Sequence, residues 1–332
     1  MKIITSGVDS EYVLNDLCNH LRLSGHDVTE IDFGKISTPI DDLLSTFRNK
    51  DVVYITSAHT NLTNNVAKFI APKFNEHYPN YLSPLEIIGR LNPRTSIYIP
   101  HDLLSPFGEE NLSEYRFLDL FDYILTPFNE RSLQATLGPQ THFIHAGWIK
   151  HSKHLEPVKR SNVESDVKIV LFISMFEHLR WRYGDEGVVD YFSPLIKSNV
   201  KVKLPAWRGV ADVEKIFNAR FPSCIIPSDE SSIAAILNAD LVLCNGASSI
   251  HAESILMGRP TVCLLDDEAG FAQEKQKKLS HLGSIVFHDY RQKAPLIEEF
   301  INHTVANFSS PPAPHFKFSI IDDIINDLSF RY

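Results

Sequence analysis

Short β-branched segments alternate with amphipathic segments along nearly the whole chain, and this alternation limits the available folds more than any other feature. Strands separated by helix-length segments are typical of parallel sheets covered by helices. A polar stretch without periodicity, at about 146–166, separates two such series. Ligands in such sheets bind at the carboxyl ends of the strands. The sequence therefore predicts an α/β protein with two Rossmann-like domains facing a cleft.

We expect an N-terminal Rossmann-like domain that binds the acceptor at 1–150 and a C-terminal one that binds a nucleotide at 151–312. A proline-rich bend and an amphipathic helix at 313–332 are expected to pack back on the first domain. The predicted strands lie at 2–5, 27–31, 51–56, 95–99, 123–126, 141–144, 167–173, 200–204, 224–226, 241–244, 261–265 and 284–287.

The charge and hydropathy of the chain exclude several classes of protein. A net charge of −9 argues against a general nucleic-acid binder, which would usually show a basic face. No apolar run approaches the roughly 18–20 residues that span a bilayer. The first residues read as a short strand rather than a signal peptide, so we expect a cytoplasmic protein. The basic stretch Lys150–Arg160 is a candidate for peripheral contact with the inner face of the membrane.

The cysteines and histidines show no metal-ligand spacing. Neither His-Glu-x-x-His nor Cys-x-x-Cys occurs, so we expect no metal site and no cofactor. Of Cys18, Cys224, Cys244 and Cys263, three lie in or beside apolar strands, which favours buried free thiols. The Gly-x-Gly-x-x-Gly fingerprint and the Walker A loop are both absent, which argues against a dehydrogenase or an NTPase.

Residues 239–263 read as one unit: a buried strand, a turn of small residues, a helix, Gly258 as its end, and a second buried strand. The turn places unpaired N–H groups at a helix N-terminus, which suits a phosphate. Glu253 lies about one helical turn further on, within reach of a sugar hydroxyl. The alternative is an ordinary strand–turn–helix in which Ser248 or Ser249 only caps the helix.

The second half resembles the donor-binding domain of GT-B glycosyltransferases, with the CDP-glycerol glycerophosphotransferase type and the UDP-N-acetylglucosamine 2-epimerase fold as the nearest families. The resemblance rests on Ala-Asp-Leu-Val-Leu at 239–243, on Ser248, Ser249 and Glu253, and on Gly-Arg-Pro at 258–260. It implies the GT-B arrangement of two Rossmann-like domains. It also implies that the two serines hold the donor diphosphate and that Glu253 holds the ribose.

One departure from this resemblance concerns the strand at 200–204. The related polymerases carry Lys-x-His-Pro after it, whereas this chain reads Lys-Val-Lys-Leu-Pro at 201–205, without histidine. We expect Lys203 to keep the electrostatic role.

Further donor-site candidates follow other strands. Ser174 and Arg180 lie in a segment expected to be a loop near the diphosphate, where the planar guanidinium suits phosphate. The alternative is a solvated basic turn. Ser228 looks like a helix N-cap, and the resemblance implies a base contact there. The acidic loop at 264–270 is expected either to bind sugar hydroxyls or to offset a helix dipole.

In the first half, His101 and Asp102 come directly after a strand and are the preferred candidates for the base that takes the acceptor proton. The alternative is that Asp102 caps a turn and His101 packs in a loop. The ends of two more strands, at 6–9 and 57–60, are weaker candidates for the same cleft.

The sequence thus predicts a metal-independent glycosyltransferase. It would move a sugar from a nucleotide-activated donor to a glycoconjugate or polysaccharide acceptor, such as a glycan or a lipid-linked molecule. Two alternatives stay open: a nucleotide-sugar epimerase or hydrolase of the same fold, and a non-catalytic nucleotide-sugar-binding partner protein.

Overall fold

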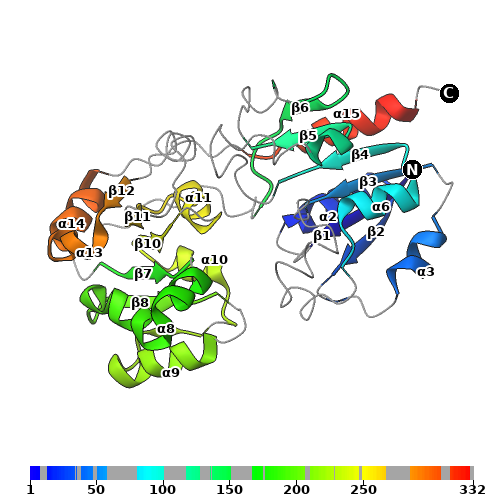
Figure 1. Ribbon diagram of the computed structural model, residues 1–332. Coiled ribbons are helices and arrows are strands. Elements are labelled where there is room, and N and C mark those ends of the chain that lie inside the picture. Colours follow the sequence, from blue (N-terminus) through cyan, green and yellow to red (C-terminus); the bar gives the residue numbers. More distant parts are fainter. Residues whose placement is uncertain are drawn as a thin grey trace. The chain divides into compact units, whose positions relative to one another are not determined.

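The computed structural model contains two compact units, each of which is described by itself (Figure 1). Unit 1 comprises Met1–Ser152 and Pro314–Tyr332, and unit 2 comprises Lys153–Ala313. The structure describes residues 1–7, 13–33, 35, 39–47, 51–57, 81–100, 117–127, 135, 137–150, 167–174, 176–205, 210–227, 229–246, 249–266, 285–307 and 315–329.

The described part of unit 1 contains a parallel six-stranded sheet of order β2-β1-β3-β4-β5-β6. Its strands are β1 (Lys2–Gly7), β2 (Asp27–Asp32), β3 (Val52–Thr56), β4 (Thr95–Tyr98), β5 (Tyr123–Thr126) and β6 (His142–His145). The strand order reverses between β1 and β3, since β2 lies on one side of β1 and all later strands lie on the other. The predicted strands of this half are confirmed.

Helices cover both faces of this sheet: α2 (Asn15–Leu23), α3 (Ile40–Ser45), α6 (Pro84–Leu91) and α15 (Phe318–Ser329). One core joins α3 and α6 to side chains such as Ile4 and Tyr54. The other core joins α2 and α15 to the opposite side chains of the same strands, such as Ile3 and Val53. Successive strand residues point to opposite faces, so buried strands of this kind serve two cores at once.

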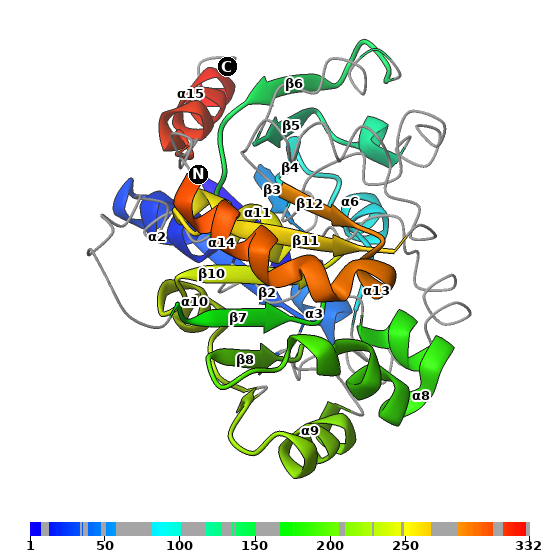
Figure 2. The same cartoon turned by 90° about the vertical axis from the view of Figure 1, so that its left-hand side faces the viewer.

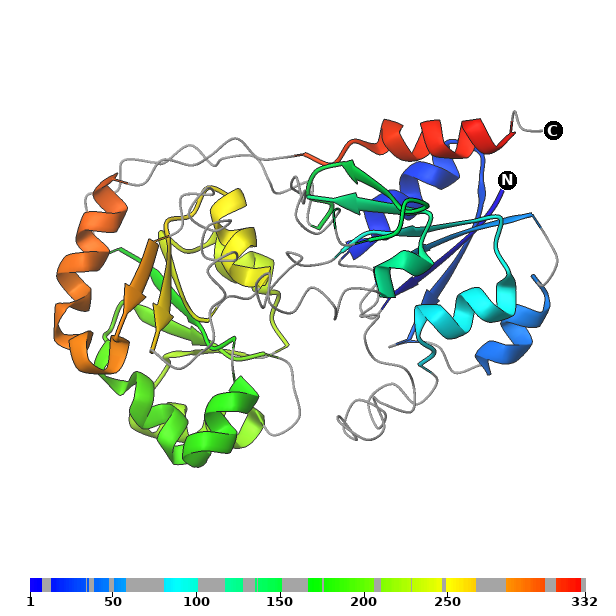
Figure 3. The same ribbon diagram turned by 45° about the horizontal axis from the view of Figure 1, so that its top comes forward.

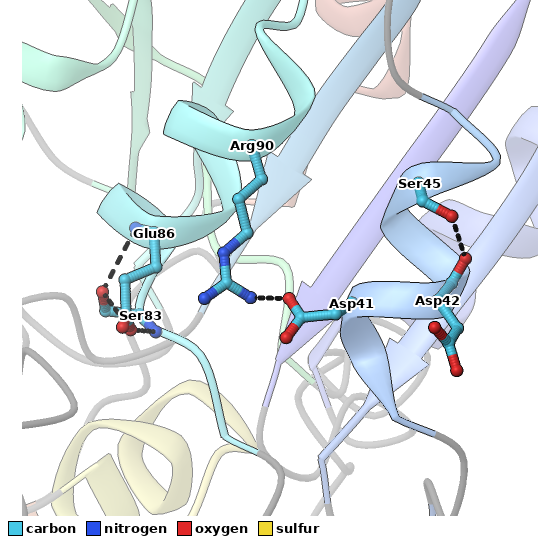
Figure 4. A network of polar contacts seen from close by, with 6 residues as sticks. All are labelled: Asp41, Asp42, Ser45, Ser83, Glu86 and Arg90. Atoms are coloured by element: carbon cyan, nitrogen blue, oxygen red, sulfur yellow. Dashed lines mark hydrogen bonds and ion pairs between the residues drawn. The ribbon is translucent and has the colours of Figure 1, made fainter.

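Polar contacts define the start of α6 and connect it to α3 (Figure 4). Ser83 accepts a hydrogen bond from the backbone N–H of Glu86, and the Glu86 carboxylate accepts one from the N–H of Ser83. This reciprocal capping box satisfies two N–H groups that the helix itself leaves unpaired. At the other end of α6, Arg90 forms an ion pair with Asp41 of α3.

The helix α15 follows unit 2 in the chain but packs on unit 1, beside α2 (Figure 3). Ile321 and Ile325 of α15 are buried in the same core as Leu17 of α2. His20 of α2 contacts the Asp322 carboxylate at 2.9 Å. The backbone N–H of Lys317 donates to the carbonyl of Ala146 at 2.8 Å, so the returning segment pairs with the end of β6.

The described part of unit 2 contains a second parallel six-stranded sheet, of order β12-β11-β10-β7-β8-β9 (Figure 2). Its strands are β7 (Ile169–Phe172), β8 (Val200–Lys203), β9 (Ile225–Ile226), β10 (Leu241–Asn245), β11 (Thr261–Leu265) and β12 (Ile285–His288). Numbered from β7, this is the order 3-2-1-4-5-6 of Rossmann domains, which reverses between the first and fourth strands. The predicted strands of this half are confirmed as well.

The helical segments of unit 2 are α8 (Phe176–Phe192), η3 (Ser193–Leu195), α9 (Val210–Arg220), α10 (Ser232–Leu237), α11 (Ser249–Leu256), α13 (Tyr290–Lys293), η4 (Ala294–Leu296) and α14 (Ile297–Asn307). The core on one face of the sheet contains residues of α8, α9 and α14 with Leu241 and Leu243 of β10. The core on the other face contains residues of α10 with Val242 and Cys244 of β10, and Ile250 of α11 packs against it.

The segment after β7 differs from the prediction. Ser174 and Arg180 were expected in a loop, but α8 is helical from Phe176. Gly184 lies inside it with φ 73° and ψ 177°, a conformation that interrupts the helix and that glycine adopts without a Cβ clash. Gly184 therefore divides α8 into two helical segments that meet at a kink. Among the described helices, none is both long and apolar enough to cross a membrane.

Candidate functional site

The candidate site of unit 2 lies where its strand order reverses, between β7 and β10. In parallel α/β sheets, ligands bind outside the carboxyl ends of the strands at such a switch point. Phe172 of β7 is in register with Cys244 of β10 on one side and with Lys203 of β8 on the other. The segments that leave these three strands therefore begin at one edge of the sheet.

Gly246 and Ser249 lie at the described ends of the segment that joins β10 to α11. Gly246 has φ 83°, a left-handed conformation that glycine adopts readily and that turns the chain out of the strand. Ser249 is the first residue of α11. At the other end, Gly258 has φ 73° and its N–H donates to the carbonyl of Ile255, so it ends the helix as predicted.

Glu253 lies four residues after Ser249 in α11, so the two side chains lie on one helix face about a turn apart. Glu253 is 1% exposed. Carboxylates are rarely buried to this degree unless they are paired, because their desolvation is costly. A role in ligand binding would explain why a carboxylate occupies this buried position.

Lys203, the last residue of β8, is 2% exposed and donates a hydrogen bond to the carbonyl of Pro227 at 2.7 Å. Burial lowers the pKa of its ammonium group, and the carboxylates of Glu214, Glu230 and Asp229 partly oppose that shift. A buried cation at this edge of the sheet is suited to an anionic ligand.

Ser174 and Arg180 follow β7 but differ in their surroundings. Ser174 is partly exposed, two residues after the end of the strand. Arg180 lies on α8, and its Nε donates to the Asp185 carboxylate at 2.6 Å. The guanidinium is thus held by an ion pair across the kink at Gly184 rather than presented on a loop.

Several predicted site residues lie outside the described residues. These are the base candidates His101 and Asp102, the phosphate candidate Ser248 and the base-contact candidate Ser228. Of the predicted donor-site residues, the structure describes Ser174, Arg180, Lys203, Ser249 and Glu253. The register brings the strand ends that carry Ser174, Lys203 and Ser249 to one edge of the sheet.

In unit 1, a buried hydroxyl network lies near the carboxyl ends of β1 and β3. The Ser6 Oγ lies 2.6 Å from the hydroxyl of Tyr54 and 2.9 Å from Thr56 Oγ1. Burial raises the pKa of Tyr54, so its hydroxyl stays protonated near neutral pH. Since β1 and β3 flank the switch point of this sheet, the network lies at the edge from which the two candidate segments start. Of these segments the structure describes 6–7 and 57, whereas 8–9 and 58–60 lie outside the described residues.

The acidic loop after β11 has a structural role at its first aspartate. Asp266 accepts hydrogen bonds from the Tyr191 hydroxyl and, at 3.0 Å, from the backbone N–H of Arg291 in the first turn of α13. A carboxylate at that place stabilises a helix N-terminus. This contact agrees with the helix-charge interpretation of Asp266.

A buried cluster joins His251 of α11 to Cys244 and Cys263 of the strands beneath it, and no sequence pattern predicts this cluster. Cys244 and Cys263 are register partners on β10 and β11. Burial raises the pKa of Cys263, but its interactions with Cys244, with His251 and with the backbone of Gly246 together lower that pKa to about 6. The pKa of Cys244 is raised by its hydrogen bond to Cys263 and by burial. Pairing of neighbouring strands, rather than spacing, brings these residues together.

The comparisons with known proteins identify the fold. No protein-family model matches the chain, and no curated protein matches it in sequence. A solved structure of UDP-GlcNAc 2-epimerase from Methanocaldococcus jannaschii, in complex with UDP-GlcNAc and UDP, is similar with a TM-score of 0.61 and 14% identity over 99% of both chains.

Two further solved structures cover nearly the whole chain. MnaA of S. aureus with UDP has a TM-score of 0.59 and 12% identity, over 99% of this chain and 97% of that one. MurG of Acinetobacter baumannii has a TM-score of 0.51 and 10% identity, over 98% of this chain and 100% of that one. The chain therefore has the GT-B fold of two Rossmann-like domains, which glycosyltransferases and UDP-GlcNAc 2-epimerases share.

Proposed function

We propose that this protein is a GT-B glycosyltransferase that binds a nucleotide-activated sugar in unit 2. The observation that supports it best is the switch point between β7 and β10, where the N-terminus of α11 and the buried Lys203 belong to one edge of the sheet. A helix N-terminus and a lysine both favour a diphosphate. UDP, which the MnaA structure contains, is a ligand of that chemistry.

Each donor-site residue has a role in this proposal. Ser248 and Ser249 hold the diphosphate at the start of α11, Glu253 accepts hydrogen bonds from the ribose hydroxyls, and Lys203 offsets the charge of the departing nucleotide. Ser174 and Arg180 approach the diphosphate from β7 and α8, and Ser228 adjoins the base. Because Glu253 and Lys203 are 1% and 2% exposed, nucleotide binding must displace what covers them.

The first test is thermal unfolding of the protein with UDP, GDP, CDP and ADP, repeated with Glu253→Gln. A nucleotide at 100 times its Kd adds about 2.7 kcal/mol to the free energy of unfolding, which raises Tm measurably. A hydrogen bond to a charged group contributes about 1.5–3 kcal/mol, so the variant should bind roughly 10- to 150-fold more weakly.

The matched control is Glu299→Gln, the same chemical change at an exposed position of α14. It should respond to nucleotide as the wild type does. A wild type whose Tm no nucleotide changes would overturn the proposal, and so would a Glu253→Gln variant that binds with unchanged affinity.

The acceptor side of the proposal rests on unit 1. His101 or Asp102 removes the acceptor proton, and a glycan or lipid-linked molecule is the acceptor. Loss of a general base lowers kcat by about 10²- to 10⁴-fold. We therefore expect His101→Ala or Asp102→Asn to reduce turnover by that factor while nucleotide affinity stays unchanged. If both variants keep wild-type turnover, the base lies elsewhere.

A nucleotide-sugar epimerase or hydrolase is the second candidate, because UDP-GlcNAc 2-epimerases are among the structures that share the fold. Such an enzyme converts the nucleotide sugar without an added acceptor. Monitoring the sugar and the free nucleotide with and without acceptor separates the two functions. Binding without any conversion under either condition would favour the non-catalytic alternative.

A further inference from the structure

The cluster beneath α11 combines three side chains that all bind soft metal ions. In the described part of the chain, Cys244, His251 and Cys263 form a group whose potential ligand atoms lie within 4.8 Å of one another. All three residues are 0% exposed. Two thiols and an imidazole at this separation are close enough to bind one metal ion together.

The backbone explains why these side chains meet. Cys244 and Cys263 are directly paired in the parallel ladder of β10 and β11, so their side chains point to the same face of the sheet. Leu243 and Leu264, their chain neighbours, belong to the core of the opposite face. The helix α11 lies over the face that carries the cysteines, and a ring nitrogen of His251 lies within 4.8 Å of both sulfur atoms.

His251 is also separate from the nucleotide-site residues of α11. It lies two positions from both Ser249 and Glu253, which is about 200° around the helix axis at 3.6 residues per turn. The face of α11 that carries those two residues is therefore different from the face that meets the cysteines. A nucleotide bound by Ser249 and Glu253 would therefore leave the His251 side chain available to the cysteines.

We propose that Cys244, Cys263 and His251 form a binding site for a thiophilic divalent metal ion, Zn²⁺, that ties α11 to β10 and β11. Two thiolates and a neutral imidazole exactly balance the charge of Zn²⁺, so the buried site carries no net charge, whereas Cu⁺ would leave one negative charge uncompensated. Zn–S bonds of about 2.3 Å and Zn–N bonds of about 2.0 Å place tetrahedral donors roughly 3.5–3.8 Å apart. Because the potential ligand atoms already lie within 4.8 Å of one another, they need to approach by at most about 1 Å.

Binding would release the remaining thiol protons, because the metal ligands are thiolates and a neutral histidine. Three protein ligands leave the fourth tetrahedral position to water or another ligand. The site does not depend on the proposed transferase function, since none of its residues has a role in nucleotide binding or acid–base chemistry.

The test uses the full-length protein, reduced and stripped of metal with a chelator. Zn²⁺ is titrated against a chromophoric chelator, and Co²⁺ is added separately to look for a thiolate-to-cobalt charge-transfer band. We expect one equivalent of Zn²⁺ per chain and a clear charge-transfer band. Even loss of a group that only supports a ligand costs 10- to 100-fold in affinity, so Cys263→Ser should bind more than about 100-fold more weakly.

Cys224→Ser is the matched control, because Cys224 is also a buried free cysteine of unit 2 but is not in the cluster. It should bind Zn²⁺ as the wild type does. His251→Gln, which keeps both cysteines, should weaken binding as well. If the serine variant fails to fold, the wild-type Co²⁺ spectrum decides alone: a missing charge-transfer band overturns the proposal, as does unchanged affinity in a folded Cys263→Ser.

Discussion

At the scale of single residues, Lys203 shows most clearly how a residue expected to bind a ligand can lower the stability of the fold. Its ammonium group is 2% exposed, and burial holds its pKa below the ordinary value of 10.5. A lysine with a depressed pKa binds fewer protons in the native state than in the unfolded state just below pH 10.5. The contribution of Lys203 to the free energy of unfolding is therefore most favourable above pH 10.5. This contribution is lost as the pH falls through the native pKa.

At neutral pH, native Lys203 thus carries the cost of a buried charge. We expect Lys203→Met to keep or raise Tm at pH 7, because methionine fills a similar volume without a charge to desolvate. The same variant should lose nucleotide affinity. Tm and nucleotide affinity are measured on the same samples, with the exposed Lys201→Met of β8 as the control. A large fall in Tm for Lys203→Met would show that the lysine stabilises the fold.

The residues that the sequence could identify are those in a local pattern. Ser249 and Glu253 stand out because a strand, a small-residue turn and a helix follow one another within a few positions. The cluster of Cys244, His251 and Cys263 depends on the pairing of β10 with β11, which no spacing rule shows. The partner of Arg180, which is Asp185, could not be predicted because that segment was expected to be a loop.

At the scale of elements, strand positions were predictable because each strand is a short β-branched run that serves two cores. The ends of the helices were less predictable than the positions of the strands. The helix α8 begins at Phe176, inside a segment that was expected to be a loop, and it is kinked at Gly184. The strand order of each sheet comes from contacts distant in sequence, which a reading of local patterns does not contain.

The capping box of α6 supports a prediction at this scale. Ser83→Ala removes the acceptor for the Glu86 N–H and one partner of its carboxylate. Loss of such a cap costs about 0.5–2 kcal/mol, so the free energy of unfolding of unit 1 should fall by that amount. Chemical denaturation measures it. Ser45→Ala is the control, because the Ser45 hydroxyl is exposed and bonds only one carbonyl at 2.7 Å. Equal losses in the two variants would contradict the capping role.

At the scale of the whole molecule, each unit has its own sheet and its own cores on both faces. Units that each have their own sheet and cores unfold as separate cooperative units unless an interface couples them. The boundary at Ser152 falls inside the polar stretch that the sequence suggested, and the segment from Pro314 onward returns to unit 1.

A cavity in α15 should therefore destabilise one unit only. Ile321 is 0% exposed in the core shared by α2 and α15, and removal of such a side chain costs about 2–5 kcal/mol. We expect calorimetry of Ile321→Ala to show one melting transition at lower temperature and a second one unchanged. Asp323→Ala, exposed on the same helix, should change neither. If both melting transitions move to lower temperature by the same amount, the two units unfold together and the prediction is wrong.

The return of α15 to unit 1 also sets an order of events on the ribosome. Unit 1 cannot close its core until α15 has been made, and all of Lys153–Ala313 is translated before that. At about 5–20 residues per second, the nascent N-terminal sheet waits roughly 10–30 s with the surface beneath α15 uncovered. Unit 2 has no such delay, since its strands and helices come from one continuous stretch. The part of the protein made first is therefore the part that finishes folding last, and it is where chaperones would be needed during synthesis.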